Sequence, residues 1–141
     1  MTTILVPVDG SPSSLNAIKA ALDWAKDRSD LALHIITVHP PILSGNVSRF
    51  VSPQVISDYY QEEGQKALDA VAPLLEGSSI QKTQSVQVGP VAITIAEYAK
   101  THKVDYIIMG TRGLSPVSGL LLGSVTTKVL SLVDIPVTLV K

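Results

Sequence analysis

Cysteine is absent from the 141 residues of the chain, which excludes disulfides, thiolate chemistry and cysteine-based metal sites. Basic residues are not in excess, since 11 Lys and Arg stand against 12 Asp and Glu and the net charge is −1. This balance argues against a nucleic-acid-binding face and against a polybasic membrane patch. Aromatic residues make up only 4% of the chain, so we do not expect the base-stacking platform that single-strand binders use.

Long apolar runs are also missing, and none reaches the length of a transmembrane helix. Met1-Thr2-Thr3 leads into the first apolar run without a charged leader segment. We therefore expect a cytoplasmic protein that interacts with neither membranes nor nucleic acid. The length is sufficient for one hydrophobic core, so we expect a single domain over residues 1–141.

Several catalytic motifs are missing as well. The chain contains no Walker sequence, no Gly-x-Gly-x-x-Gly fingerprint and no kinase catalytic loop. His34, His39 and His102 do not form a metal-ligand pattern, and Glu62-Glu63 is best interpreted as a solvated helix face. The residues thus predict neither a catalytic centre nor a protein-built metal site.

Apolar residues follow two alternating patterns along the chain. Five segments have the pattern of strands, namely Ile4–Val8, Leu31–Val38, Ile80–Gly89, Asp105–Met109 and Ile135–Val140. Four segments between them have helical features: one with Leu15, Ile18, Leu22 and Ala25, one from Ser52-Pro53 to about Leu75, one with Ile93, Ile95, Ala96 and Ala99, and one that begins near Gly123. This alternation predicts one doubly wound α/β domain with a five-stranded parallel sheet and helices on both faces.

Three of the predicted strands end where a ligand would be expected. Pro7-Val8-Asp9, Val38-His39 and Met109-Gly110 are the carboxyl ends, and the strand order 3-2-1-4-5 would make these strands neighbours. Open α/β sheets bind ligands outside such ends, where the strand order reverses. Asp9 has two possible roles there, either to close an Asx turn or to bind a ribose hydroxyl or a metal beside phosphates.

Glycines surround one loop at this edge. Gly110 and Gly113 follow the fourth strand, and Gly123 precedes Ser124 at the start of the last helix. A helix that begins there directs its unpaired N–H groups and the positive end of its dipole at the loop, which favours phosphate. The alternative is that the glycines serve only turns and a helix end. Arg112 is equally consistent with a phosphate contact and with a solvated loop residue.

The last strand, Ile135–Val140, ends the chain and remains apolar although it carries Pro136. If it lies at the edge of the sheet, its unpaired backbone favours pairing with a second copy, so we predict a homodimer through this strand. The alternative is an ordinary edge strand that is covered by its own helices.

Together these motifs resemble the universal stress protein family, in the branch with the Gly-x2-Gly-x9-Gly-Ser signature that binds ATP. The resemblance rests on Val6–Ser11 (Val-Pro-Val-Asp-Gly-Ser), on Asp105–Gly113 (Asp-Tyr-Ile-Ile-Met-Gly-Thr-Arg-Gly) and on Gly123–Thr126 (Gly-Ser-Val-Thr), and it extends over the whole chain. It implies a cytosolic homodimer that acts in stress response or signalling and binds ATP or another adenine nucleotide, with Mg²⁺ or Mn²⁺ bridging phosphate oxygens.

The resemblance also implies the residues of the binding site. Pro7 and Asp9 would lie beside the adenosine, Val38 would recognise adenine through its main chain, Met109 and Gly110 would border the ribose and phosphates, and Gly113, Gly123, Ser124 and Val125 would surround the phosphates. The segment Leu114–Leu122 has no Lys or Arg, which departs from related proteins and leaves Arg112, the helix terminus and a metal to neutralise charge. A triphosphate preference is therefore open, and a nucleotide-free dimeric scaffold or a slow ATPase are the alternative functions.

Overall fold

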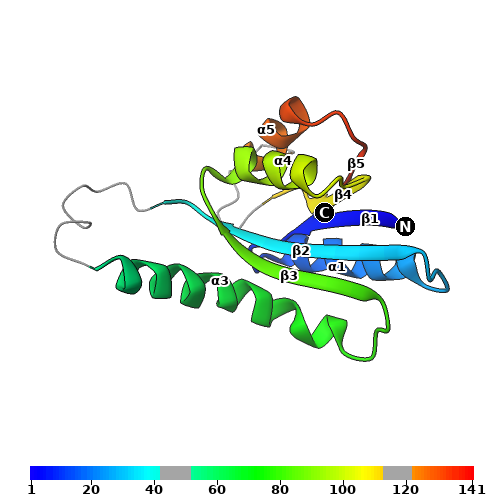
Figure 1. Cartoon of the computed structure of the whole chain (residues 1–141). Coiled ribbons are helices and arrows are strands. Elements are labelled where there is room, and N and C mark those ends of the chain that lie inside the picture. Colours follow the sequence, from blue (N-terminus) through cyan, green and yellow to red (C-terminus); the bar gives the residue numbers. More distant parts are fainter. Residues whose placement is uncertain (42–51, 113–121) are drawn as a thin grey trace.

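The computed structural model describes residues 1–41, 52–112 and 122–141 of the chain (Figure 1). Its elements follow in the order β1 (Thr2–Pro7), α1 (Pro12–Ala25), β2 (Leu31–His39), α3 (Pro53–Leu75), β3 (Gln81–Val88), α4 (Val91–Thr101), β4 (Tyr106–Gly110), α5 (Ser124–Leu132) and β5 (Val137–Val140). The strands form one parallel sheet in the order β3-β2-β1-β4-β5. The predicted fold and strand order are thus confirmed.

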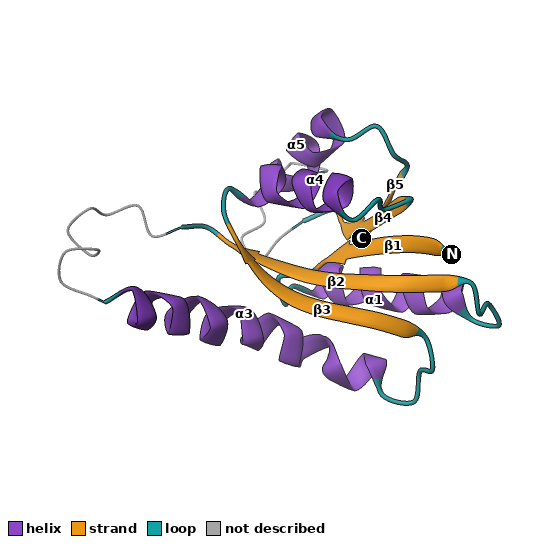
Figure 2. Ribbon diagram, viewed as in Figure 1, coloured by secondary structure: helices purple, strands orange, loops and turns teal. Residues whose placement is uncertain are grey.

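Helices cover both faces of the sheet, with α1 and α3 on one side and α4 and α5 on the other (Figure 2). Alternate residues of β1 enter the two layers, since Ile4 and Val6 belong to the core under α1 and α3 and Leu5 to the core under α4 and α5. Side chains buried on both faces explain why the inner strands have continuous apolar sequences rather than alternating ones.

Two helices begin at the Ser-Pro pairs that the sequence offers. Ser11 caps α1 by accepting a hydrogen bond from Ser14 N at 3.2 Å, and Ser52 caps α3 by accepting one from Val55 N at the same distance. Proline occupies the first helical position in each case, where a missing N–H has no consequence. Pro73 lies inside α3, yet the helix continues to Leu75.

The sequence pattern misplaced one side chain and several strand bounds, by two residues at the starts of β1 and β5 and by one residue elsewhere. Ile93 was expected on the apolar side of α4 but is 42% exposed, because the row that faces the sheet is Ala92, Ile95 and Ala99. β1 begins earlier than predicted because Thr2 and Thr3 already pair with β2. β5 begins later, at Val137.

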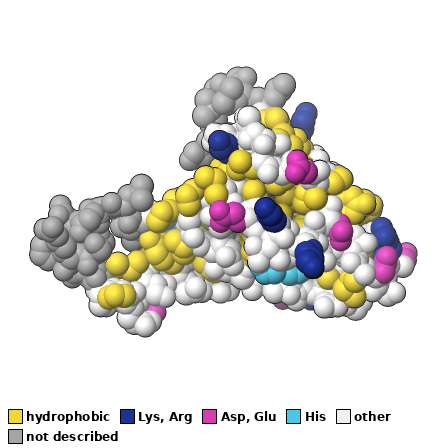
Figure 3. Space-filling model, turned by 45° about the horizontal axis from the view of Figure 1, so that its top comes forward, with side chains coloured by type: hydrophobic (Ala, Val, Ile, Leu, Met, Phe, Trp, Pro, Cys, Tyr) yellow, Lys and Arg dark blue, Asp and Glu magenta, His cyan; other side chains and the backbone are white. Residues whose placement is uncertain are grey.

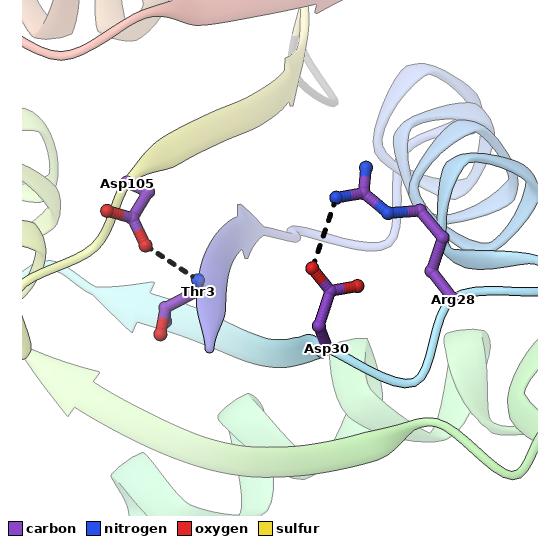
Figure 4. A network of polar contacts seen from close by, with 4 residues as sticks. All are labelled: Thr3, Arg28, Asp30 and Asp105. Carbon is purple, nitrogen blue, oxygen red and sulfur yellow. Dashed lines mark hydrogen bonds and ion pairs between the residues drawn. The ribbon is translucent and has the colours of Figure 1, made fainter.

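The amino ends of the strands are joined by polar contacts (Figure 4). Asp105 Oδ2 accepts a hydrogen bond from Thr3 N at 2.8 Å, and Asp105 N donates to Thr3 O at 2.9 Å. Arg28 and Asp30 form an ion pair at 3.4 Å that is exposed and therefore weak. The two bonds between Thr3 and Asp105 fix β1 against the start of β4, at the end of the sheet opposite to the ligand edge predicted above. None of the helices in the described part of the chain has the length and apolar character that a membrane crossing requires.

One half-buried polar cluster lies between β2 and α4. His34 Nδ1 is 2.7 Å from the Tyr98 hydroxyl, and the His102 ring stacks on the Tyr98 ring with centroids 3.8 Å apart. Burial lowers the pKa of His34 below its ordinary value of 6.5, and the nearby His102 adds to this effect because a second positive charge is repelled. Burial also raises the pKa of Tyr98.

We expect the protein to lose stability below pH 6.5 because of His34. With a lower pKa in the folded chain, the unfolded chain binds the proton more readily, so the free energy of unfolding falls as the pH falls through the folded pKa and is unaffected well above 6.5. Urea unfolding between pH 7.5 and about pH 5 measures this slope. His34→Gln should flatten it, and an unchanged slope in that variant would contradict the assignment.

Candidate functional site

The carboxyl ends of three adjacent strands meet at one edge of the sheet, as expected. The β1–β2 ladder ends with the pair Pro7 and Ile36, whereas β2 continues beside β3 as far as His39. Val38 therefore lies two residues beyond the last pair with β1, so its main chain is not part of the ladder on that side. This is the position at which a planar ring could form hydrogen bonds with the backbone.

The loop after β1 is closed by its own aspartate. Asp9 Oδ1 accepts a hydrogen bond from Ser11 N at 2.9 Å, which is an Asx turn. Gly10 between them has φ +83°, a conformation that glycine adopts without strain. The structural role of Asp9 is confirmed, and the residue is exposed at the edge of the sheet where a ligand was predicted.

Gly110 at the end of β4 is packed against helix α1. A Cβ on Gly110 would lie 2.8 Å from Ser13 Cβ and 2.9 Å from the Ser13 carbonyl carbon. The Met109 side chain is buried in the core under α4 and α5, and its main chain is paired with Leu139 of β5. Arg112 is exposed, and its carbonyl oxygen accepts a hydrogen bond from Ser11 Oγ at 3.5 Å.

Helix α5 is held beside this loop by two hydrogen bonds. Gly123 N donates to Thr111 O at 2.6 Å, and Thr126 Oγ1 donates to Gly110 O at 2.9 Å. They bring Gly110 close to Gly123 and Ser124, which follow it by more than a dozen positions in the sequence. Gly110 at the end of β4 and the start of α5 therefore lie side by side.

The first turn of α5 presents main-chain N–H groups that have no partner among the described residues. Gly123 is the N-cap residue and supplies no side-chain cap, so the N–H groups of the first turn have no partner within the helix. The side chains of Ser124 and Val125 are exposed there. The Gly123 N–H is already bonded to Thr111, so the available donors are those of Ser124 and Val125 rather than of Gly123. Gly113 lies outside the described residues.

The sequence interpretation missed the polar residues that organise the site. Ser13 Oγ donates to Val140 O at 3.0 Å and accepts from Thr111 N at 3.2 Å, and the buried Thr111 and Thr126 hold the loop to the neighbouring elements. The only signal for them is the serine-rich run Ser11-Pro12-Ser13-Ser14, which resembles an ordinary helix start. Within the described residues, no three His, Cys, Asp or Glu gather as metal ligands would.

Comparisons with known proteins agree with this arrangement. Residues 1–141 match the universal stress protein family. The universal stress protein MJ0531 of Methanocaldococcus jannaschii is 35% identical over 140 residues, which cover 98% of this chain and 81% of that protein. The solved structure of hypothetical protein MJ0577 superposes with a TM-score of 0.86 at 26% identity, over 99% of this chain and 95% of that one. A universal stress protein in complex with cAMP superposes with a TM-score of 0.62 at 28% identity, again over 99% and 95% of the two chains. This chain is therefore a member of the universal stress protein family.

Proposed function

We propose that this protein binds an adenine nucleotide, ATP or a related adenylate, at the carboxyl edge of its sheet and acts as a nucleotide-dependent homodimer in a cytoplasmic stress response. The domain over residues 1–141 would be the nucleotide-binding unit. A relative that is 28% identical is in complex with cAMP, which supports the ligand class.

The observation that carries the proposal is the uncapped first turn of α5 beside the Gly110–Arg112 loop. Main-chain N–H groups of Ser124 and Val125 would bind phosphate oxygens, because a helix N-terminus combines free donors with a positive dipole end. Arg112 would contribute the charge that the segment Leu114–Leu122 lacks. Adenine would lie beside the Val38 main chain and the ribose near Pro7, Asp9 and Met109.

Mass spectrometry of ligand released from freshly purified protein tests the proposal directly. We expect an adenylate in the released fraction and, after its removal, calorimetric binding of ATP, ADP, AMP or cAMP with one preferred. Absence of heat with all four would reject nucleotide binding. The order of the four affinities shows whether Arg112, the start of α5 and a metal ion neutralise enough charge for the protein to prefer a triphosphate.

A nucleotide-free dimeric scaffold is the second candidate, and Gly110 favours it. The absence of a Cβ at Gly110 is already explained by its contact with Ser13, so this glycine does not require a ligand. The same calorimetric titration separates the two candidates, because a scaffold would bind none of the four adenylates.

A slow ATPase is the third candidate. A divalent ion, Mg²⁺ or Mn²⁺, would be held mainly by phosphate oxygens, since Asp9 at this edge already accepts a hydrogen bond through Oδ1 and offers only its remaining oxygen lone pairs. The ion would supply charge neutralisation when bound. Phosphate release in the presence of Mg²⁺, and its loss in Asp9→Ala, would establish the activity.

The proposed dimer would form through β5. Among the described residues, β5 pairs with β4 alone and so lies at the edge of the sheet. Ile107 N bonds to Pro136 O and Thr111 N to Val140 O, so even-numbered residues of this strand direct their main-chain groups at β4. Val137 and Leu139 direct theirs outward. Hydrophobic side chains are also exposed over α4 and α5 (Figure 3), among them Ile93, Leu130 and Leu132.

Val137→Pro is expected to weaken the dimer about tenfold or more, because each copy loses an outward N–H in a two-fold interface. Proline is tolerated on an edge strand where its missing N–H faces away from the sheet. Val137→Ala is the matched control, since it shortens the same side chain but keeps the N–H. Sedimentation velocity over a dilution series measures both variants. Equal dissociation constants for the two would contradict pairing through β5.

A further inference from the structure

Thr111 joins the start of α5 to the end of β5 through its own main chain. Its N–H donates to Val140 O at 2.9 Å, and its carbonyl oxygen accepts from Gly123 N at 2.6 Å. One residue thus lies between the helix terminus proposed to bind phosphate and the strand proposed to pair with a second copy. Thr111 itself is buried among closely packed neighbours, so a shift of its peptide groups displaces the residues bonded to it.

Ser13 in the first turn of α1 completes this connection. Its hydroxyl donates to Val140 O at 3.0 Å and accepts from Thr111 N at 3.2 Å, so three polar atoms from α1, the loop and β5 form a closed triangle. Ser13 comes this near because Gly110 has no side chain to separate the two backbones. A serine hydroxyl suits the position because it donates and accepts at once.

We propose that Ser13 is a positioning residue that couples the nucleotide site to the open edge of β5. The inference rests on the proposed function, because it describes how the same site would be regulated. Phosphate bound at Ser124 and Val125 would fix the start of α5 and, through Gly123, the Thr111 peptide. Thr111 and Ser13 together then hold the Val140 carbonyl, which keeps the last residues of β5 extended and ready to pair.

The direction of the effect follows from this geometry. Nucleotide strengthens the dimer by a coupling factor, and by thermodynamic linkage each of the two equivalent sites of the dimer binds nucleotide more tightly than the monomer does, by the square root of that factor. We expect that factor to be about fivefold or more in the unmodified protein. Without the Ser13 hydroxyl, the bond from Thr111 N to Val140 O stands alone at the end of an edge strand, where ends fray, and less of the effect is transmitted.

The experiment measures the dimer dissociation constant of the full chain by sedimentation velocity, with and without saturating ATP. The ratio of the two constants is the coupling factor. In Ser13→Ala we expect this ratio to fall toward one. Asn16→Ala is the matched control, because Asn16 Nδ2 also holds the end of the chain to α1, by a 2.9 Å hydrogen bond to Lys141 O. Within the described residues, the Asn16 side chain forms no hydrogen bond with Thr111 or Val140. Its ratio should equal that of the unmodified protein.

A second measurement leaves Ser13 intact. Val137→Pro weakens pairing outside the triangle, so its ATP affinity as a monomer should be lower than that of each site in the dimer by the square root of the coupling factor. Equal ATP affinities in monomer and dimer, or an unchanged ratio in Ser13→Ala, would overturn the coupling while leaving nucleotide binding in place. A chain that binds no adenylate at all would overturn the proposed function and the coupling together.

Discussion

Replacing Ser124 with proline is expected to weaken adenylate binding by about 10- to 100-fold with little change in the fold. Ser124 is the first residue of α5, where proline fits the helix and removes only an N–H that has no partner within it. The preceding Gly123 has φ −72° and ψ 164°, an extended conformation that a following proline allows. A hydrogen bond from an N–H to a charged phosphate contributes about 1.5–3 kcal/mol, which corresponds to that range of affinity.

Ser124→Ala is the matched control because it removes the hydroxyl but keeps the main-chain donor. If the helix terminus binds phosphate through N–H groups, calorimetry should give the alanine variant a much smaller loss of affinity than the proline variant. Circular dichroism and urea unfolding would establish that both variants fold. Equal affinities in the proline variant and the unmodified protein would exclude this turn of α5 from the site, whatever the rest of the edge binds.

The fold was predictable from sequence because its signals are local. Strands buried on both faces have continuous apolar runs, and the two Ser-Pro pairs at Ser11 and Ser52 place helix starts within single turns. Ile93 was misplaced because α4 is apolar on more than one side, so its composition does not show which row faces the sheet. Periodicity identifies a helix more reliably than it identifies the buried face of a largely apolar one.

The site was predictable only in part. The glycines and Ser124 follow a spacing that sequence reveals, and the Asx turn of Asp9 is a contact between residues two apart. Ser13, by contrast, bonds to residues 98 and 127 positions away, and nothing local distinguishes it from any serine in a first turn. The sequence also could not show why residue 110 is a glycine. A glycine required by packing and a glycine required by a ligand are identical in sequence.

Gly110→Ala is the prediction that separates those two reasons, and we expect it to lower the free energy of unfolding by about 1–3 kcal/mol even without ligand. Gly110 does not have a positive φ, so alanine introduces no backbone strain of its own. Its Cβ would instead lie within 3 Å of the Ser13 side chain and backbone, and the first turn of α1 would have to move. Urea unfolding of nucleotide-free protein measures the loss.

A double-mutant cycle with Ser13→Gly tests whether that contact is the cause. Ser13→Gly alone should destabilise the protein through the lost hydrogen bonds and through the lower helix propensity of glycine. It also removes two of the three atoms that the new Cβ of Gly110→Ala would meet, Ser13 Cβ and Oγ, although the Ser13 carbonyl carbon remains at 2.9 Å. The double variant should therefore be more stable than the sum of the two single losses predicts, by about 0.5 kcal/mol or more. Strict additivity would show that Gly110 is not required by its packing against α1, and the phosphate interpretation of this glycine would then be the stronger one.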